Sequence, residues 1–399
     1  MGRTSGPGAV LRALAVGEGV STFGDQLARV AVAILVYQAT GSATAAALTY
    51  AATLLPDLVA GPLLVPLVDR HPRRAVMVVC ALAQAGFALL LALPTPPVAV
   101  VVGAVAGIAA AGAPFRAAQS VTVRAALPEG WHGRGQSRLS MVRESGQLIG
   151  LGAAAAVIGL VGPTTALLVN AASFVFVAVV VLRYVPALPA PAPGPGGPVP
   201  GTGFRLLWTD RRLRVLNGLV LIGTLAILPD AVMVPLVAEM GAPQWVVGPL
   251  LAADVVGFLI AAAVLDRRGD TAGQSLIGPL VVLSVLPLAL FAVDPGPVTA
   301  AVLLVLSGVG AAHIPAVRAA VLALVPDEVG GRTVGWVRTG LRAGQGLGVV
   351  AGGLLADALG SSGAIAAVGF VGTAAALVGA AAWHRSRPDQ GRCRLGVSA

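Results

Sequence analysis

Charged residues are scarce in this chain of 399 residues, where Asp, Glu, Lys and Arg together make up 11%. A soluble domain carries roughly 25%. Hydrophobic residues make up 57% of the chain, and the mean hydropathy is +0.89. The apolar runs are too many and too long for water-soluble cores, and they do not alternate as barrel strands would. The composition therefore predicts an all-α, multi-pass membrane protein.

Lysine is absent, because all 26 basic residues are arginine. This excludes a P-loop lysine, and with it an ATP-driven motor within the chain, as well as a Schiff-base lysine. The two cysteines, Cys80 and Cys393, form no CxxC pair and no disulfide framework. The four histidines form no HExxH motif, and there is no GxSxG elbow. We therefore expect neither an enzyme nor a metal or other cofactor. The lysine-free, Arg-, Ala-, Gly- and Pro-rich composition indicates a bacterial origin.

The net charge of +9 has two interpretations. One is nucleic-acid binding, which a basic chain permits. The other is membrane topology, because arginines gather in loops on the cytoplasmic side of membrane proteins. Here they gather between apolar runs, so we expect a lipid bilayer and no nucleic acid as partner.

Twelve apolar runs are long enough to cross a bilayer as helices. The first six are 11–39, 44–68, 75–93, 97–125, 138–162 and 164–185. The other six are 212–240, 243–265, 272–293, 296–325, 333–359 and 361–384. A Pro/Gly-rich segment separates the two sets and is too rich in these residues to form a spanning helix. The predicted parts are a six-helix bundle at 1–185, a linker at 186–211, a second bundle at 212–384 and a tail at 385–399.

Arginine placement predicts the orientation. The loops after the second, fourth and eighth runs carry arginine, as do the linker and the tail, whereas the loops at 40–43, 94–97 and 294–297 carry none. The linker, the tail and both termini are therefore expected in the cytoplasm, with the protein in the cell membrane.

A motif occurs twice in the chain. Asp57, eleven residues and Asp69-Arg70 correspond to Asp254, eleven residues and Asp266-Arg267, 197 positions later. Three further pairs follow at nearly the same offset: Leu35-Val36 with Gly41 and Leu236-Val237 with Gly241, 127–129 and 325–327, and Gly146-Gln147-x-x-Gly150 and Gly344-Gln345-x-x-Gly348. Both Asp-Arg loops lie on the cytoplasmic side, so the halves form a parallel repeat.

Twelve spans in two parallel halves, a central linker and an Asp-Arg loop after the second span resemble the major facilitator superfamily. That family's loop pattern, Gly-x-x-x-Asp-Arg-x-Gly-Arg-Arg, reads here as Val65-x-x-x-Asp69-Arg70-His71-Pro72-Arg73-Arg74. The stretch at 24–43 looks like the branch of macrolide-efflux proteins and enterobactin exporters. The antiporter signature of the fifth span, which includes a proline, is replaced at 150–155 by a stretch without one.

The resemblance implies a monomeric secondary transporter that works by alternating access. Its branch implies a proton-coupled efflux pump for drug-like or natural-product small molecules, with the proton gradient as energy source. Two alternatives remain open at this stage. One is a proton-coupled or facilitative importer of a small organic solute, and the other is a non-transporting receptor or scaffold.

The resemblance also places the cavity on spans 1, 4, 7 and 10, which hold many of the polar groups within spans. Each ionisable group there costs roughly 2.5–3.5 kcal/mol on insertion scales and needs a partner or a function. The candidates for the substrate and proton cavity are Glu18, Asp25, Arg29, Arg116, Gln119, Asn217, Asp230, His313 and Arg318.

Helical spacing predicts partners for several of these groups. Glu18, Asp25 and Arg29 share one face, so Asp25 and Arg29 can form an i,i+4 ion pair, either as a proton site or as a permanent structural pair. Arg116 can meet Asp25 or Glu18, or bind an anionic substrate group. Asp230 can pair with Arg318, and His313 is either a proton relay or a structural residue.

A second set of candidates belongs to a gate on the cytoplasmic side. The resemblance implies that Asp69 engages the start of span 11, where Arg338 and Arg342 share a face, with local pairing to Arg73 as the alternative. By the repeat, Asp254 and Asp266 should face Arg138 or Arg143 in span 5. The gating candidates are Asp57, Asp69, Arg70, Arg73, Arg74, Asp254, Asp266, Arg267, Arg338 and Arg342.

Overall fold

The computed structural model describes residues 7–56, 59, 64, 68, 71–94, 96–127, 132–186, 202–268, 270–325 and 327–386, and their regular structure is helical. The first half contains α1 (Pro7–Thr40), α2 (Ala43–Ala51), α5 (Arg73–Leu91), α6 (Val98–Ala126), α7 (His132–Val161) and α8 (Pro163–Tyr184). The second half contains α9 (Thr202–Thr209), α10 (Arg211–Gly223), η1 (Thr224–Ile227), α11 (Leu228–Ala231), α12 (Met233–Glu239), η2 (Gln244–Val246), α13 (Val247–Arg268), α14 (Asp270–Ala289), η3 (Leu290–Val293), α15 (Pro297–Ala311), α16 (His313–Leu324) and α17 (Asp327–Ser386).

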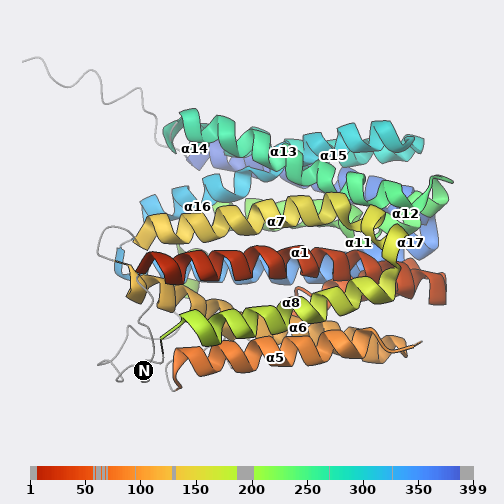
Figure 1. The fold of residues 1–399 in the computed structure, drawn as a ribbon. Coiled ribbons are helices and arrows are strands. Elements are labelled where there is room, and N and C mark those ends of the chain that lie inside the picture. The colour runs from red at the N-terminus through yellow and green to blue at the C-terminus, as the bar shows by residue number, and fades with distance from the viewer. Residues whose placement is uncertain are drawn as a thin grey trace, which may run out of the picture.

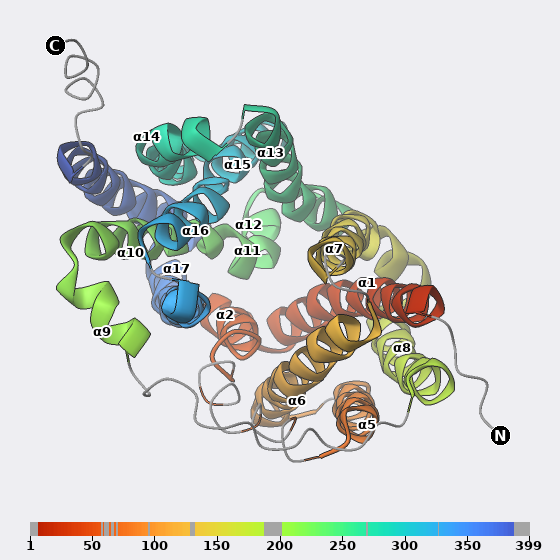
Figure 2. The ribbon, with the colours of Figure 1, turned by 90° about the vertical axis from the view of Figure 1, so that its left-hand side faces the viewer.

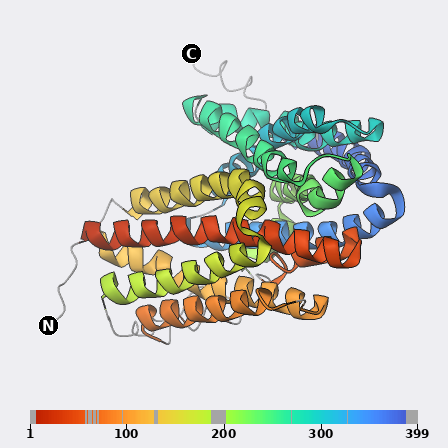
Figure 3. The same ribbon diagram turned by 45° about the vertical axis from the view of Figure 1, so that its right-hand side comes forward.

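The long helices lie side by side along one direction (Figure 1). In Figure 3 the red α1 lies between the yellow α7 and the yellow-green α8, and these are its two most extensive helix contacts. Figure 2 looks along the bundle and shows α5, α6 and α8 on one side and α10 and α14–α17 on the other. The halves meet where α2 packs on α17 and α7 packs on α13. We call the end where α1 begins the terminal end, and the opposite end, where α1 passes into α2, the far end.

Nine helical stretches within the described residues are long and apolar enough to cross a membrane. They confirm the multi-pass, all-helical prediction. The last stretch, Gly335–Ser386, contains Gly360 in a left-handed conformation (φ 76°), at the predicted boundary between spans 11 and 12. Much of the predicted second span falls outside the described residues, so the count of twelve stays a prediction.

Two predicted spans are interrupted. Span 7 was expected to be one helix over 212–240, but it consists of α10, the 3₁₀ turn η1, and the short α11 and α12. Pro229 and Pro235 lie in this stretch and lack the backbone N–H that continues a helix. Span 10 is likewise divided into α15 and α16 at Ala312, shortly before Pro315. These breaks separate Asp230 and His313 from the long helices that precede them.

Four glycines with positive φ occupy matching places in the two halves. Gly41 and Gly241 have φ of 65° and 64°, and Gly162 and Gly360 have φ of 82° and 76°. A left-handed glycine commonly ends a helix because it has no β-carbon to clash. Its N–H then satisfies a carbonyl of the last turn, as Gly41 does for Tyr37 and Gly162 does for Ile158. The members of the two pairs are 200 and 198 positions apart, close to the offset of the sequence repeat.

In the glycine row at positions 340, 344, 348 and 352, Gly344 and Gly352 pack closely within the second half. A β-carbon at Gly344 would lie 3.0 Å from the Thr224 side chain, and one at Gly352 would lie 2.2 Å from the Leu228 side chain. These two glycines let α17 approach η1 and the start of α11 closely. This contact keeps α17 in register with the interrupted stretch that contains Asp230.

Candidate functional site

A cavity of about 220 Å³ lies on the terminal side of the molecule's centre, and its wall comes mainly from the first half. Its polar lining includes Glu18 and Asp25 from α1, Arg116 from α6 and Arg143 from α7. Among the described residues, the second half contributes Arg338 and Arg342 of α17 to this wall. Its apolar part comprises Leu14, Phe115, Phe174, Val177, Val180 and Val181. The cavity therefore combines charged and apolar surfaces.

Glu18 is held by two partners from different helices. Its carboxylate pairs with the Arg143 guanidinium at 2.5 Å and accepts a hydrogen bond from the Gln119 amide at 2.9 Å. The close approach of α7 to α1 makes this possible, because a β-carbon at Gly146 would lie 3.3 Å from the Gly19 carbonyl oxygen. Arg143 was expected near Asp254 or Asp266, and in the structure it pairs with Glu18 instead of Asp254; the side chain of Asp266 lies outside the described residues.

Asp25 lies among polar groups of three helices. It interacts electrostatically with Glu18 and Arg116 and hydrogen-bonds with the Asn170 side chain of α8. Arg116 folds back over Gly112, where a β-carbon would lie only 2.7 Å from the guanidinium nitrogen. The structure thus brings Arg116 toward Asp25, one of the two partners that the sequence allowed.

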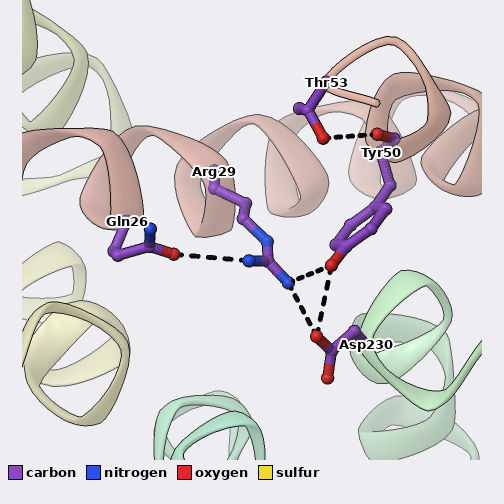
Figure 4. A network of polar contacts seen from close by, with 5 residues as sticks. All are labelled: Gln26, Arg29, Tyr50, Thr53 and Asp230. Carbon is purple, nitrogen blue, oxygen red and sulfur yellow. Dashed lines mark hydrogen bonds and ion pairs between the residues drawn. The ribbon is translucent and has the colours of Figure 1, made fainter. Parts of the chain in front are cut away.

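Arg29, Tyr50 and Asp230 form a network that joins the two halves, which we call the central network (Figure 4). One guanidinium nitrogen of Arg29 donates to the Asp230 carboxylate at 2.9 Å and to the Tyr50 hydroxyl at 2.6 Å. The Tyr50 hydroxyl donates to the same carboxylate oxygen at 3.2 Å, and the guanidinium lies 4.3 Å from the Tyr50 ring centre. The Arg29 and Asp230 side chains are 20% and 18% exposed, so water screens this contact only in part.

The central network corrects two predictions. Arg29 pairs with Asp230 rather than with Asp25, and Asp230 pairs with Arg29 rather than with Arg318. Asp25 does not pair with Arg29, because the Arg29 side chain reaches Asp230 of the second half while Asp25 interacts with residues of the first half. Sequence reasoning missed Tyr50. The sequence contained a clue, because Tyr50 lies within an apolar run and a buried tyrosine hydroxyl usually needs a hydrogen-bond partner.

Asp254 of α13 lies near the central network, where it interacts electrostatically with Asp230 and Arg29. The sequence had placed it opposite Arg138 or Arg143, and the structure does not bring it there. A close contact between α13 and α15 sets its position, since a β-carbon at Gly308 would lie 1.9 Å from the Asp254 carbonyl oxygen. One arginine therefore has two acids from the second half as neighbours.

The halves also touch at the far end, through Asp357 of α17. Its carboxylate accepts hydrogen bonds from the Ser42 hydroxyl at 2.9 Å and from the Ala43 and Thr44 N–H groups at 2.7 and 3.3 Å. These N–H groups begin α2, and a carboxylate there is favoured by the helix dipole. A nearby contact lies within the second half, where Glu239 accepts from the Ser361 N–H and hydroxyl.

Five predicted cavity residues lie off the cavity wall: Arg29 and Asp230, which belong to the central network, and Asn217, His313 and Arg318. His313 is fully buried, where its Nδ1 contacts the Gly310 carbonyl oxygen at 2.8 Å. Its Nε2 faces Gly223 of α10, where a β-carbon would lie 2.3 Å away. Asn217 is buried in α10 and Arg318 is exposed on α16. His313 therefore lies away from the cavity, and the choice between a proton relay and a structural residue stays a prediction.

Much of the predicted gate lies outside the described residues. This applies to Asp57, Asp69 and Arg70 and to the side chains of Asp266 and Arg267. In the described part, Arg73 begins α5, and Arg74 donates a hydrogen bond to the Leu182 carbonyl oxygen of α8. Arg338 and Arg342 face the cavity. The pairing of Asp69 with span 11 therefore stays a prediction.

Comparisons with known proteins agree with this architecture. The family model described as Major Facilitator Superfamily matches residues 14–314. No curated protein matches the chain significantly.

Solved structures with the same fold share little sequence with the chain. A bacterial homolog of the human lysosomal transporter Spinster, inward-facing and unoccupied, has a TM-score of 0.74 and 13% identity, with 96% of this chain and 99% of that chain covered. The nucleoside transporter NupG has a TM-score of 0.70 and 15% identity, with 94% and 98% covered. A variant of the peptide transporter POT in complex with sulfate has a TM-score of 0.74 and 14% identity, with 94% of each covered. At these identities the likeness shows the fold alone.

Proposed function

Because the chain belongs to the major facilitator superfamily, we propose that this membrane transporter is a proton-coupled efflux pump for drug-like or natural-product small molecules. It works as two parallel six-helix bundles that rock around a central site. The proposed bundles are 1–185 and 212–384, joined by a cytoplasmic linker and followed by a cytoplasmic tail. The matched left-handed glycines support this repeat layout.

One observation carries the alternating-access proposal: the Arg29–Asp230 ion pair joins the halves next to a polar cavity. The cavity lies on the terminal side of this pair, and Asp357 joins the halves beyond it. If the termini are cytoplasmic, as arginine placement predicts, the central network and Asp357 close the outer side. Opening that side then requires both contacts to break, which is a rigid-body transition.

The central network also supports proton coupling. Arg29 is shared between the neighbouring acids Asp230 and Asp254. Protonation of Asp230 removes the charge that holds Arg29 across the boundary, so the outer side can open. Loss of that proton restores the attraction and closes it. Proton binding and substrate movement are thus coupled through the conformational change, because protonation of Asp230 controls whether the outer side is open.

Cavity size favours a small solute over a drug-sized one, and an importer of a small organic solute is the second candidate. Drug-sized ligands occupy pockets of about 300–1,000 Å³, whereas this cavity measures about 220 Å³. Import and export use the same two conformations and differ in the direction of the coupled gradient.

Transport in proteoliposomes under an imposed pH gradient tests the proposal. For a panel of radiolabelled solutes, wild type should accumulate a substrate against its own gradient, and the direction of the pH gradient that drives it separates export from import. Asp230→Asn should lose this pH-driven accumulation and retain substrate counterflow. If Asp230→Asn and Asp254→Asn both keep the wild-type response to pH, proton coupling at the central network is wrong.

A further inference from the structure

We propose that the transported molecule is a compact organic acid whose anionic group is bound between arginines of the two halves. This inference rests on the proposed transport function, takes the small organic solute rather than the drug-sized molecule as its substrate, and adds the chemical class of that solute. The cavity charges, their division between the halves and the apolar wall carry it.

Positive side chains outnumber acids on the described part of the cavity wall. Arg116, Arg143, Arg338 and Arg342 line it together with two carboxylates, so four positive charges meet two negative ones. Among the described lining residues, guanidinium groups thus outnumber carboxylates two to one. Guanidinium groups bind carboxylates through two parallel hydrogen bonds, so an arginine-rich wall selects an anion both by charge and by shape.

The arginines are divided between the halves. Arg116 and Arg143 belong to α6 and α7, whereas Arg338 and Arg342 stand one turn apart on α17. The two acids, Glu18 and Asp25, both belong to α1 and interact with arginines of the first half. The described acids of the wall thus lie on one side, and the α17 pair brings positive charge to the other.

This division gives the anion a role in the transport cycle. Closing the terminal side would bring the α17 arginines toward Arg116 and Arg143, and like charges repel strongly where water is excluded. An anion bound between them offsets this repulsion, whereas a neutral or cationic molecule does not. The substrate thus stabilises the closed state more than the open one, which is the requirement for a ligand to shift the equilibrium.

The apolar part of the cavity wall and the cavity volume limit the size and polarity of the rest of the substrate. Leu14, Phe115 and Phe174 offer an apolar surface beside the charged one. The volume of about 220 Å³ lies below the range of about 300–1,000 Å³ for drug-sized ligands. A small apolar body with one acidic group fits both the surface and the size.

Three compounds of one shape test the charge requirement: cyclohexanecarboxylate, cyclohexanecarboxamide and cyclohexylmethylamine. Each is titrated against the purified full-length protein in an uncharged detergent at constant ionic strength, and the thermal unfolding midpoint is measured. The carboxylate should raise the midpoint, and the amide and amine should not. Equal shifts with the amide, a larger shift with the amine, or no shift with the carboxylate would overturn the proposal.

Variants test the location. Arg338→Gln/Arg342→Gln should weaken carboxylate binding by about tenfold or more, the effect of losing charge-assisted hydrogen bonds. Arg318→Gln removes an exposed arginine that lies off the cavity wall, and it should bind as wild type does. Arg116→Gln provides a second test from the first half, should the double variant fail to fold. Equal binding to wild type and to a folded cavity variant would overturn the site.

Two further arms separate this inference from related possibilities. Sulfate that stabilises the protein as much as the carboxylate would show a site for a free inorganic anion and overturn the organic acid. Carboxylate binding without pH-driven transport would leave the inference intact and contradict the proposed coupling. Transport of the amine in place of the carboxylate, driven by the pH gradient, would support the proposed coupling and overturn the inference of an acidic substrate.

Discussion

The two ion pairs that begin on α1 differ in what they join. Glu18 pairs with Arg143 inside the first half, whereas Arg29 pairs with Asp230 of the second half. Each α1 residue lies eleven residues from an end of its helix, about 16 Å along the axis. Rigid-body rocking leaves the first pair intact and has to break the second. Under the proposed transport cycle, α1 therefore holds one contact that persists and one that breaks.

The largest effect is expected when a contact between the halves is made covalent. In a variant without the native cysteines, Ser42→Cys/Asp357→Cys places two thiols where a hydrogen bond of 2.9 Å now joins the halves. Oxidation should reduce transport to background, and a reductant should restore it. The matched control is Glu239→Cys/Ser361→Cys, which links two elements of the second half at the same end. Equal inactivation of both pairs would contradict a special role for the contact between the halves.

Removal of the cation from the central network should have the next largest effect. Arg29→Met leaves Asp230 and Asp254 without their shared partner, and loss of one member of a buried pair costs about 3–5 kcal/mol. We expect a lower thermal midpoint and loss of pH-driven transport. Arg29→Asp/Asp230→Arg should recover much of the stability by restoring opposite charges. If the exchange variant is as unstable as Arg29→Met, the pair does not act through its charges.

A smaller effect is expected from the pair within the first half. Glu18→Gln removes one charge but keeps an oxygen that accepts from Gln119, so the cost should be about 1–3 kcal/mol. The equilibrium between the two conformations should not change. Labelling of a single cysteine at position 42 reports that equilibrium. Its rate should equal that of the Glu18-containing parent and should rise in Asp230→Asn.

The smallest effect is expected at Gly112. An alanine there would place its β-carbon 2.7 Å from the Arg116 guanidinium, and this flexible side chain can shift away. Affinity for an acidic ligand should fall about two- to fivefold, equivalent to roughly 0.4–1 kcal/mol. The matched substitution is Gly103→Ala on the same helix, where a β-carbon would meet no atom within 4 Å. Equal losses at both positions would show that α6 tolerates no alanine, independent of Arg116.

Composition predicts the architecture of this chain better than spacing predicts its contacts. The scarcity of charge indicated a helical membrane protein, and the Asp-Arg loop indicated its family, which the family match confirms. The partners of Arg29 were missed because Asp230 is 201 positions away and Tyr50 is 21 away. Which residue meets Arg29 depends on how the halves pack, and helical periodicity within one segment carries no information about that.

The interruption of span 7 shows the same limit from another side. Pro229 and Pro235 were visible in the sequence, but hydropathy averages over a whole window and therefore predicted one continuous helix. In the structure, the second part of this span forms a 3₁₀ turn and two short helices, and each short helix contains one of the prolines. Asp230 owes its position in the central network to that break.

The matched left-handed glycines Gly41 and Gly241 mark equivalent positions in the two halves, so residues can be compared by their distance from these glycines. Arg29 precedes Gly41 by twelve residues, and Asp230 precedes Gly241 by eleven. Their charges thus stand at nearly the same depth on corresponding segments. In a symmetric homodimer, residues on the two-fold axis face identical residues, so an arginine there would face an arginine. If the chain arose by fusion of two copies, opposite charges could face each other at the two-fold axis only after the fusion, when the two halves could change independently. The Arg29–Asp230 pair would then be younger than the fold that contains it.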